Sequence, residues 1–433
     1  MTVPIIQGWE PRPTPPADRG QPRDLSFLAA LVRALVLREQ SSSTAGPVPA
    51  GMPGPVRAAP AAAPLDRAAS AGAPAAVGSA PPSALAADGA SPRAPSPSAP
   101  PPIEALGAAL GIGSLFEKTP PSAPRPLDAY PRPPGDTGRG FHWIPTLHSD
   151  PSVVDRFVGE AKKMGASWVV FLNDGSAIGD NDYLVRTLVA NGIEPVMRIY
   201  TPHGEPITGD LTRMVRHYVA LGVHYFQPYN EPNLPEENPD GQVSVSGYVD
   251  RWIPAARAIL AGGGLPGLGG LAPGAPVDDV GFLRSTIEEI KRRGATDLLD
   301  NAWISMHNYT FNRPIGYQDD SNGFLKFRWY DQVVRDELGR SLPIIGTEGG
   351  PRLGDSVDPR YPPVDEQRRD ELAAAAFQYL DHREPYLFAQ TQWVLANAAG
   401  GGADPSWDKD ALFGPDGTPT PLANLLRTQE AAT

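Results

Sequence analysis

Short apolar runs alternate with amphipathic segments from Phe141 onward, and this alternation restricts the possible folds more than any other feature of the sequence. Such apolar runs are typical of strands buried on both faces, and the amphipathic segments have the period of helices that cover a sheet. A strand followed repeatedly by a helix predicts a parallel sheet with helical crossovers. There are eight apolar runs: 141–145, 168–173, 195–200, 225–230, 267–271, 303–309, 343–347 and 388–395.

Eight such units predict a (β/α)8 barrel, an α/β fold that typically needs about 250 residues. The amphipathic segments expected in its outer ring are 153–164, 211–221, 249–260, 282–293 and 366–380. The fifth run is the weakest of the eight, because the glycine-rich stretch 262–274 fits an irregular loop equally well.

Composition divides the chain before this alternation begins. Of 52 prolines, 28 lie in the first 135 residues, together with many alanines and serines. Such a segment has too few large apolar side chains to offset the entropy lost on ordering. We therefore expect a largely disordered Pro/Ala/Ser-rich tail and linker over 1–135, with one short helix at 24–39 behind a possible Asp24 cap, and the barrel over 136–433.

Charge and composition exclude some partners. The net charge is −12 and the barrel region has no cluster of Lys and Arg, so a nucleic-acid partner is not expected. Residues 1–20 lack the pattern of a signal peptide, and the apolar run 25–37 carries Arg33 and is too short for a membrane span. We expect a cytoplasmic or non-classically exported chain without a membrane span, whose oligomeric state the sequence does not indicate.

Two glutamates follow apolar runs of the predicted barrel. Glu231 stands in the motif Asn-Glu-Pro after the fourth run, and Glu348 precedes a glycine pair after the seventh. Active sites of such barrels form at the carboxyl ends of the strands, and strands four and seven lie across the barrel mouth from each other. Two facing carboxyl groups about 5 to 5.5 Å apart suit glycosidic cleavage with retained configuration, one as proton donor and the other as nucleophile.

With these motifs the sequence resembles the clan A glycoside hydrolases, the large cellulase-like group, over roughly 138–427. The resemblance implies that Glu231 is the general acid/base and Glu348 the nucleophile. It further implies that the amide of Asn230 binds the sugar 2-hydroxyl. A carbohydrate substrate is expected, and neither a cofactor nor a metal.

Further site residues come from three other runs. By the same resemblance, the Tyr309 hydroxyl contacts the nucleophile and His307 borders the subsite; residues two apart share a face of a strand. Trp393 matches the aromatic platform for the sugar ring, whose C–H face can pack on π density. Arg198 could bond the nucleophile and keep it ionised, although in many clan members the comparable arginine lies on strand two.

Several alternatives stay open at this stage. The leading hypothesis is a retaining hydrolase of β-glycosidic bonds that works by double displacement. The same scaffold also fits a non-catalytic carbohydrate-binding barrel or a transglycosylase, and His142 with His307 and Asp174 could hold the metal of a barrel hydrolase or aldolase. Trp143 and Asn173 fit a subsite contact and rim packing equally well. The loops 232–247 and 349–365 suggest the walls of a groove, while sugar identity and endo or exo cleavage are not indicated.

Overall fold

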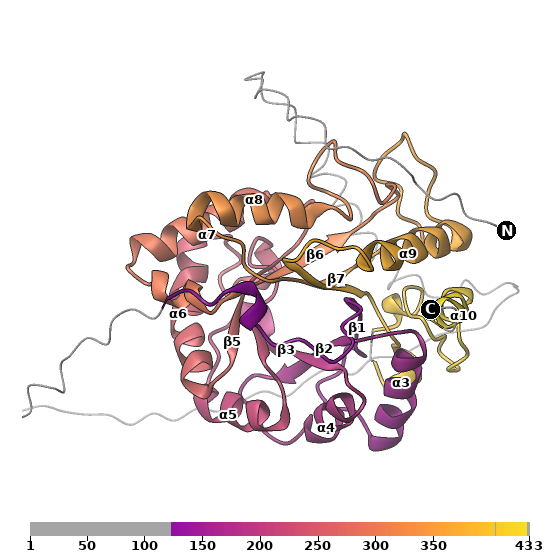
Figure 1. Ribbon diagram of the computed structural model, residues 1–433, viewed down its shortest axis with the longest axis horizontal. Helices are drawn as coiled ribbons and strands as arrows, with labels where there is room; N and C mark the ends of the chain where they lie inside the picture. The colour runs from indigo at the N-terminus through magenta and orange to yellow at the C-terminus, as the bar shows by residue number, and fades with distance from the viewer. Residues whose placement is uncertain (1–122, 403, 431–433) are drawn as a thin grey trace, which may run out of the picture. The chain divides into compact units, whose positions relative to one another are not determined.

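Eight parallel strands form a closed barrel in the computed structural model, which describes residues 123–402 and 404–430 (Figure 1). Each strand pairs with the next along the chain, and the first pairs with the eighth. The predicted (β/α)8 fold is therefore confirmed. The predicted helix at 24–39 and most of the predicted tail lie outside the described residues.

The strands lie close to the predicted runs. They are β1 (Arg139–His142), β2 (Trp168–Asp174), β3 (Glu194–Tyr200), β4 (Tyr225–Pro228), β5 (Leu265–Leu271), β6 (Trp303–Tyr309), β7 (Ile344–Gly350) and β8 (Leu387–Gln392). The weakest prediction, β5, is a fully buried strand. Its glycines have a packing reason, because a Cβ on Gly267 would lie 2.7 Å from the ring of Trp303 on β6.

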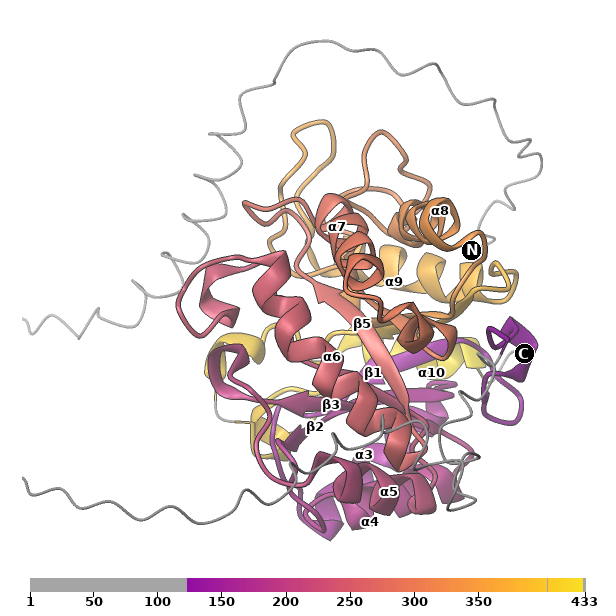
Figure 2. The same ribbon diagram turned by 90° about the vertical axis from the view of Figure 1, so that its left-hand side faces the viewer.

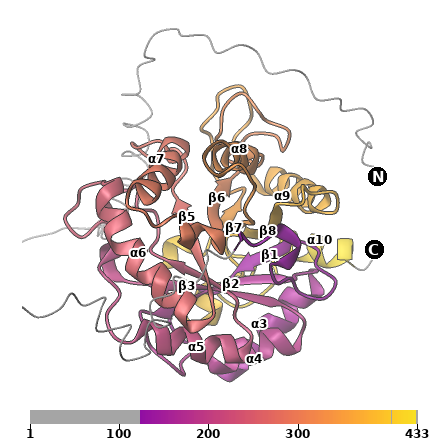
Figure 3. The same cartoon turned by 60° about the vertical axis from the view of Figure 1, so that its left-hand side comes forward.

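Helices surround the strands (Figure 3). They are α3 (Pro151–Lys163), α4 (Asp182–Ala190), α5 (Leu211–Leu221), α6 (Val245–Gly262), α7 (Asp279–Arg292), α8 (Lys326–Leu338), α9 (Glu366–Leu380) and α10 (Pro421–Glu430). Short 3-10 turns are η3 (Leu127–Ala129), η4 (Pro202–Gly204), η5 (Pro235–Glu237), η6 (Thr296–Asp300), η7 (Ala398–Gly400) and η8 (Pro405–Trp407). The amphipathic segments named from the sequence correspond to α3, α5, α6, α7 and α9. Figure 2 shows α6 alongside β5, which it contacts, and α10 joins α3 through the Arg427–Glu160 ion pair.

Large aromatic side chains fill the barrel at the amino-terminal ends of the strands. Trp168, Tyr225, Trp303 and Phe388 are fully buried and pack against one another. Tyr130 closes this end, since its hydroxyl donates to the Ala302 carbonyl at 2.9 Å. The predicted tail reached residue 135, whereas the chain already packs on the barrel from η3 onward. Polar side chains lie at the opposite mouth of the barrel, which is formed by the carboxyl ends of the strands.

The helices give no sign of a membrane segment: within residues 123–402 and 404–430, none has the length and apolar character that crossing a bilayer requires.

Candidate active site

Glu231 lies in a constrained turn just after β4. Tyr229 and Glu231 have positive φ angles of 63° and 35°, a region that side chains other than glycine adopt at a cost. The backbone N–H of Glu231 donates to the carbonyl of Gly270 on β5 at 2.8 Å, and the Glu231 carbonyl accepts from Leu234 at 2.8 Å. These bonds hold the turn, so the half-buried carboxyl group of Glu231 has a defined position at the barrel mouth.

Glu348 lies inside β7, and both of its carboxylate oxygens accept hydrogen bonds. Arg198 on β3 donates through Nη1 to Oε1, and the Tyr309 hydroxyl donates to Oε2 at 2.7 Å. Burial alone would raise the pKa of Glu348, but the adjacent His307 and Arg198 side chains outweigh it and hold the pKa well below its ordinary range. Glu348 is therefore ionised at neutral pH.

The two donors to Glu348 keep their protons. Burial and the charge of Glu348 raise the pKa of the Tyr309 hydroxyl well above its ordinary value. Burial lowers the pKa of Arg198, but Glu348 more than offsets this, so the guanidinium stays charged. Glu348 thus faces one fixed cation and one fixed hydroxyl donor, an arrangement that favours a carboxylate as nucleophile over a proton carrier.

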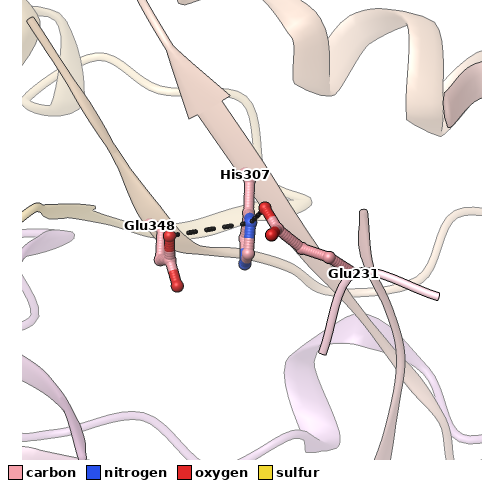
Figure 4. Close-up of side chains that lie close together, drawn as sticks. All are labelled: Glu231, His307 and Glu348. Atoms are coloured by element: carbon pink, nitrogen blue, oxygen red, sulfur yellow. Dashed lines mark hydrogen bonds and ion pairs between the residues drawn. The ribbon is translucent and has the colours of Figure 1, made fainter. Parts of the chain in front are cut away.

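His307 on β6 stands between the two glutamates, as Figure 4 shows. Its Nδ1 lies 2.8 Å from Glu231 Oε1 and 3.8 Å from Glu348 Oε2, and its side chain is fully buried. One oxygen of each glutamate and a His307 nitrogen all lie within 4.8 Å of one another. The two carboxyl groups therefore face each other across His307 at the barrel mouth.

The same three side chains are the only group in the described part of the chain with a geometry that could hold a metal ion. The alternative set of His142, His307 and Asp174 does not come together there. Both oxygens of Glu348 are engaged by Arg198 and Tyr309, and the guanidinium would repel a cation at this point. The surroundings of Glu348 therefore disfavour a metal ion at this trio.

Trp393 follows β8 and lies beside β7, since its backbone N–H donates to the Gly349 carbonyl at 2.9 Å. The Trp393 indole packs on the His142 ring at 4.5 Å and meets Trp407 edge-on at 5.5 Å. Burial, aided by the Arg198 charge, lowers the pKa of His142 to about 3, so this imidazole is neutral. Only 7% of Trp393 is exposed, so little of the indole is open to a ligand.

Asn230 precedes Glu231 and contacts a residue that the sequence did not single out. Its Nδ2 donates to Glu237 Oε1 at 3.0 Å. Burial raises the pKa of Glu237; the bond from Asn230 opposes this rise, and the charge of Glu231 adds to it. The acidic character of the loop 232–247 was the only sequence signal for a third carboxylate at the site.

Trp143 and Asn173, for which the sequence left two roles open, serve rim packing. The buried Trp143 indole donates to Ser149 Oγ at 3.0 Å. The amide of Asn173 donates to the carbonyls of Gly175 and Ala177 at 3.1 Å, and its oxygen accepts from Asn181 at 3.0 Å. The structure therefore brings together Arg198, Asn230, Glu231, His307, Tyr309, Glu348 and Trp393, while these two residues hold loops.

Comparison with known proteins gives distant likenesses only. No protein-family model and no curated protein matches the sequence. Among solved structures, the chain is similar to a family 39 glycoside hydrolase from Bacteroides cellulosilyticus, with 15% identity, a TM-score of 0.47, and coverage of 69% of this chain and 63% of that one. It is also similar to an endo-β-1,4-glucanase from Xanthomonas axonopodis pv. citri, with 14% identity, a TM-score of 0.43, and coverage of 68% and 99%. A third likeness is to a family 128 endo-β-1,3-glucanase from Sorangium cellulosum, with 16% identity, a TM-score of 0.41, and coverage of 66% and 98%. At these identities the function of the chain has to come from the residues of its own site.

Proposed function

We propose that this chain is a retaining glycoside hydrolase that cleaves β-glycosidic bonds of an oligo- or polysaccharide. The observation that carries the proposal is the pairing of Glu231 with Glu348, whose nearest ligand oxygens lie within 4.8 Å and whose surroundings differ. Glu348 is held ionised by the adjacent His307 and Arg198 side chains, whereas Glu231 has no arginine or lysine bonded to it among the described residues. Two carboxyl groups in unlike surroundings are suited to the roles of acid and nucleophile.

In the first step, an ionised oxygen of Glu348 attacks the anomeric carbon while the bond from that carbon to the leaving oxygen breaks. Glu231 donates its proton to the leaving oxygen, and a covalent glycosyl ester on Glu348 results. His307 holds Glu231 Oε1 through Nδ1, which leaves the other oxygen free to carry the proton. In the second step, Glu231 takes a proton from water as the water attacks the anomeric carbon and releases Glu348.

The decisive experiment is hydrolysis of a panel of aryl β-glycosides and polysaccharides by the unaltered chain and by Glu348→Gln. Loss of turnover in the variant, with first release of the β-anomer by NMR in the unaltered protein, would support the proposal. Glu236→Gln is the matched control, because Glu236 is an exposed glutamate of the same active-site rim. Equal turnover of Glu348→Gln and the unaltered chain would refute the assignment, and glycan binding without cleavage would favour a non-catalytic barrel instead.

A further inference from the structure

A third carboxylate lies beside the proposed catalytic pair and has no part in the two steps above. Glu237 is the last residue of η5, in the loop between β4 and α6, and its side chain is half-buried. Its carboxylate accepts a hydrogen bond from the amide of Asn230, the residue that precedes Glu231. The charges of Glu231, Glu348 and Arg198 all act on Glu237, which places it at the edge of the same site.

The loop that carries Glu237 is held in place. The next residue, Asn238, is buried, and its amide donates to the carbonyls of Pro232 and Leu234 at 3.0 and 2.7 Å. Its oxygen accepts from Arg251 Nη2 of α6 at 3.0 Å. Because the backbone beside Glu237 is tied to both the turn after Glu231 and a helix, the carboxylate has a fixed position relative to Asn230.

Glu237 determines which way the Asn230 amide faces. The Asn230 Nδ2 donates to Glu237 Oε1, so the NH2 group of the amide faces Glu237. The Asn230 oxygen is enclosed and accepts no bond from the described residues, although the side chain as a whole is half-buried. The enclosed oxygen is therefore not the end of the amide that a ligand would meet. Glu237 accepts a hydrogen bond from one of the two N–H groups of the amide, and the second N–H remains available.

The second N–H has one suitable partner on a sugar. Since Glu231 and Glu348 act at the anomeric carbon, the amide next to Glu231 lies near that carbon's neighbours, the ring oxygen and the 2-hydroxyl. The ring oxygen becomes positive in an oxocarbenium-like transition state and is then a poor acceptor. The 2-hydroxyl oxygen stays an acceptor throughout, and bonds to it strengthen as the transition state forms.

We propose that Glu237 is a positioning residue that fixes the Asn230 amide so that its free N–H bonds the 2-hydroxyl of the sugar in the transition state. The inference rests on the proposed hydrolase function and on the 2-hydroxyl contact that the resemblance implies for Asn230; what it adds is the part that Glu237 plays in that contact. Glu237 acts only through Asn230 and does not touch the reacting atoms. Its removal should therefore slow the chemical step on sugars that carry the 2-hydroxyl and leave others nearly unaffected.

The test compares two substrates of the full chain: the 4-nitrophenyl β-glycoside that it hydrolyses fastest, and the 2-deoxy counterpart of that glycoside. Glu237→Ala should lower kcat/KM on the 2-hydroxy substrate roughly 10- to 100-fold, mostly through kcat, because a charge-assisted contact is lost. On the 2-deoxy substrate the loss should stay under about 3-fold. Glu236→Ala, which removes the exposed neighbouring carboxylate, should leave both substrates unchanged.

Two further variants guard against a merely structural effect. Glu237→Gln keeps the size of the side chain but can present either end of its amide, so it should lower the ratio of the two kcat/KM values less than Glu237→Ala does. In an Asn230→Ala background, Glu237→Ala should have no additional effect on that ratio. Equal losses on both substrates, or an additive loss in the double variant, would overturn the inference. Inactivity of the unaltered chain on every glycoside would instead refute the proposed function, and the inference with it.

Discussion

Replacing Arg198 with Met should move the low-pH limb of the activity profile to higher pH. Arg198 is the only arginine or lysine bonded to Glu348 among the described residues, and their side chains are only 12% and 9% exposed. Water therefore screens this pair weakly, and methionine keeps much of the arginine's length and apolar stem. The variant leaves Glu348 with the Tyr309 hydroxyl as its remaining donor.

The size of the shift follows from the burial of the pair. Removing one partner of a buried ion pair costs about 3–5 kcal/mol while the other stays charged. Glu348 can avoid this cost by binding a proton, and one pKa unit corresponds to about 1.36 kcal/mol. Because Tyr309 still stabilises the carboxylate, we take the lower figure, which gives a rise of roughly 2 pH units in the pKa of Glu348.

The direction of the pH shift follows from the depressed pKa of Glu348 in the unaltered protein. Its Glu348 has a depressed pKa, so the stability that this group contributes is present above the ordinary glutamate pKa and is lost only as pH falls through the depressed value. Without Arg198, only His307, His142 and the Tyr309 hydroxyl oppose the effect of burial, so Glu348 protonates at higher pH. Both the acid limb of kcat/KM and the acid unfolding midpoint should then move upward.

The assay is kcat/KM against pH on an activated aryl β-glycoside, which reports the pKa values of the free enzyme. Arg213→Met, an exposed arginine on α5, is the matched control and should leave the profile in place. A folded Arg198→Met protein whose acid limb stays within about half a pH unit of the original, against the roughly 2 units expected, would refute the reasoning.

Three other changes test separate parts of the structure. Tyr309→Phe removes the 2.7 Å hydrogen bond to Glu348, so kcat/KM should fall about 10-fold with little change in melting temperature, and an unchanged rate would argue against that contact. Lys326→Met leaves the buried carboxylate of Asp279 without its cation and should destabilise the fold by about 3–5 kcal/mol in urea unfolding; adding Asp279→Leu should recover part of the loss, and a double variant no more stable than the single one would contradict this. Gly267→Ala forces a methyl group against an indole 2.7 Å away and should cost about 1–3 kcal/mol by the same method, which a variant of unaltered stability would disprove.

The sequence by itself determined the barrel and the strands that carry its chemistry. Alternation of apolar runs with amphipathic segments is periodic, and periodicity can be read without knowing which residues touch. Parallel strands in a closed barrel all end at one mouth, so Glu231, His307, Tyr309 and Glu348 had to lie near one another once the fold was known. The same reasoning predicted the bond from Arg198 to Glu348, which the structure contains.

Only the tertiary structure decided the contacts that depend on loop paths and ring orientations. That Glu237 bonds Asn230, that Trp407 covers Trp393, and that Tyr130 closes the barrel at the amino-terminal ends of the strands all follow from non-periodic segments. Such segments take their course from side chains distant in sequence, as when Asn238 ties its loop to α6. A single sequence carries no local signal for these pairings, because each depends on distances that exist only after the strands have closed.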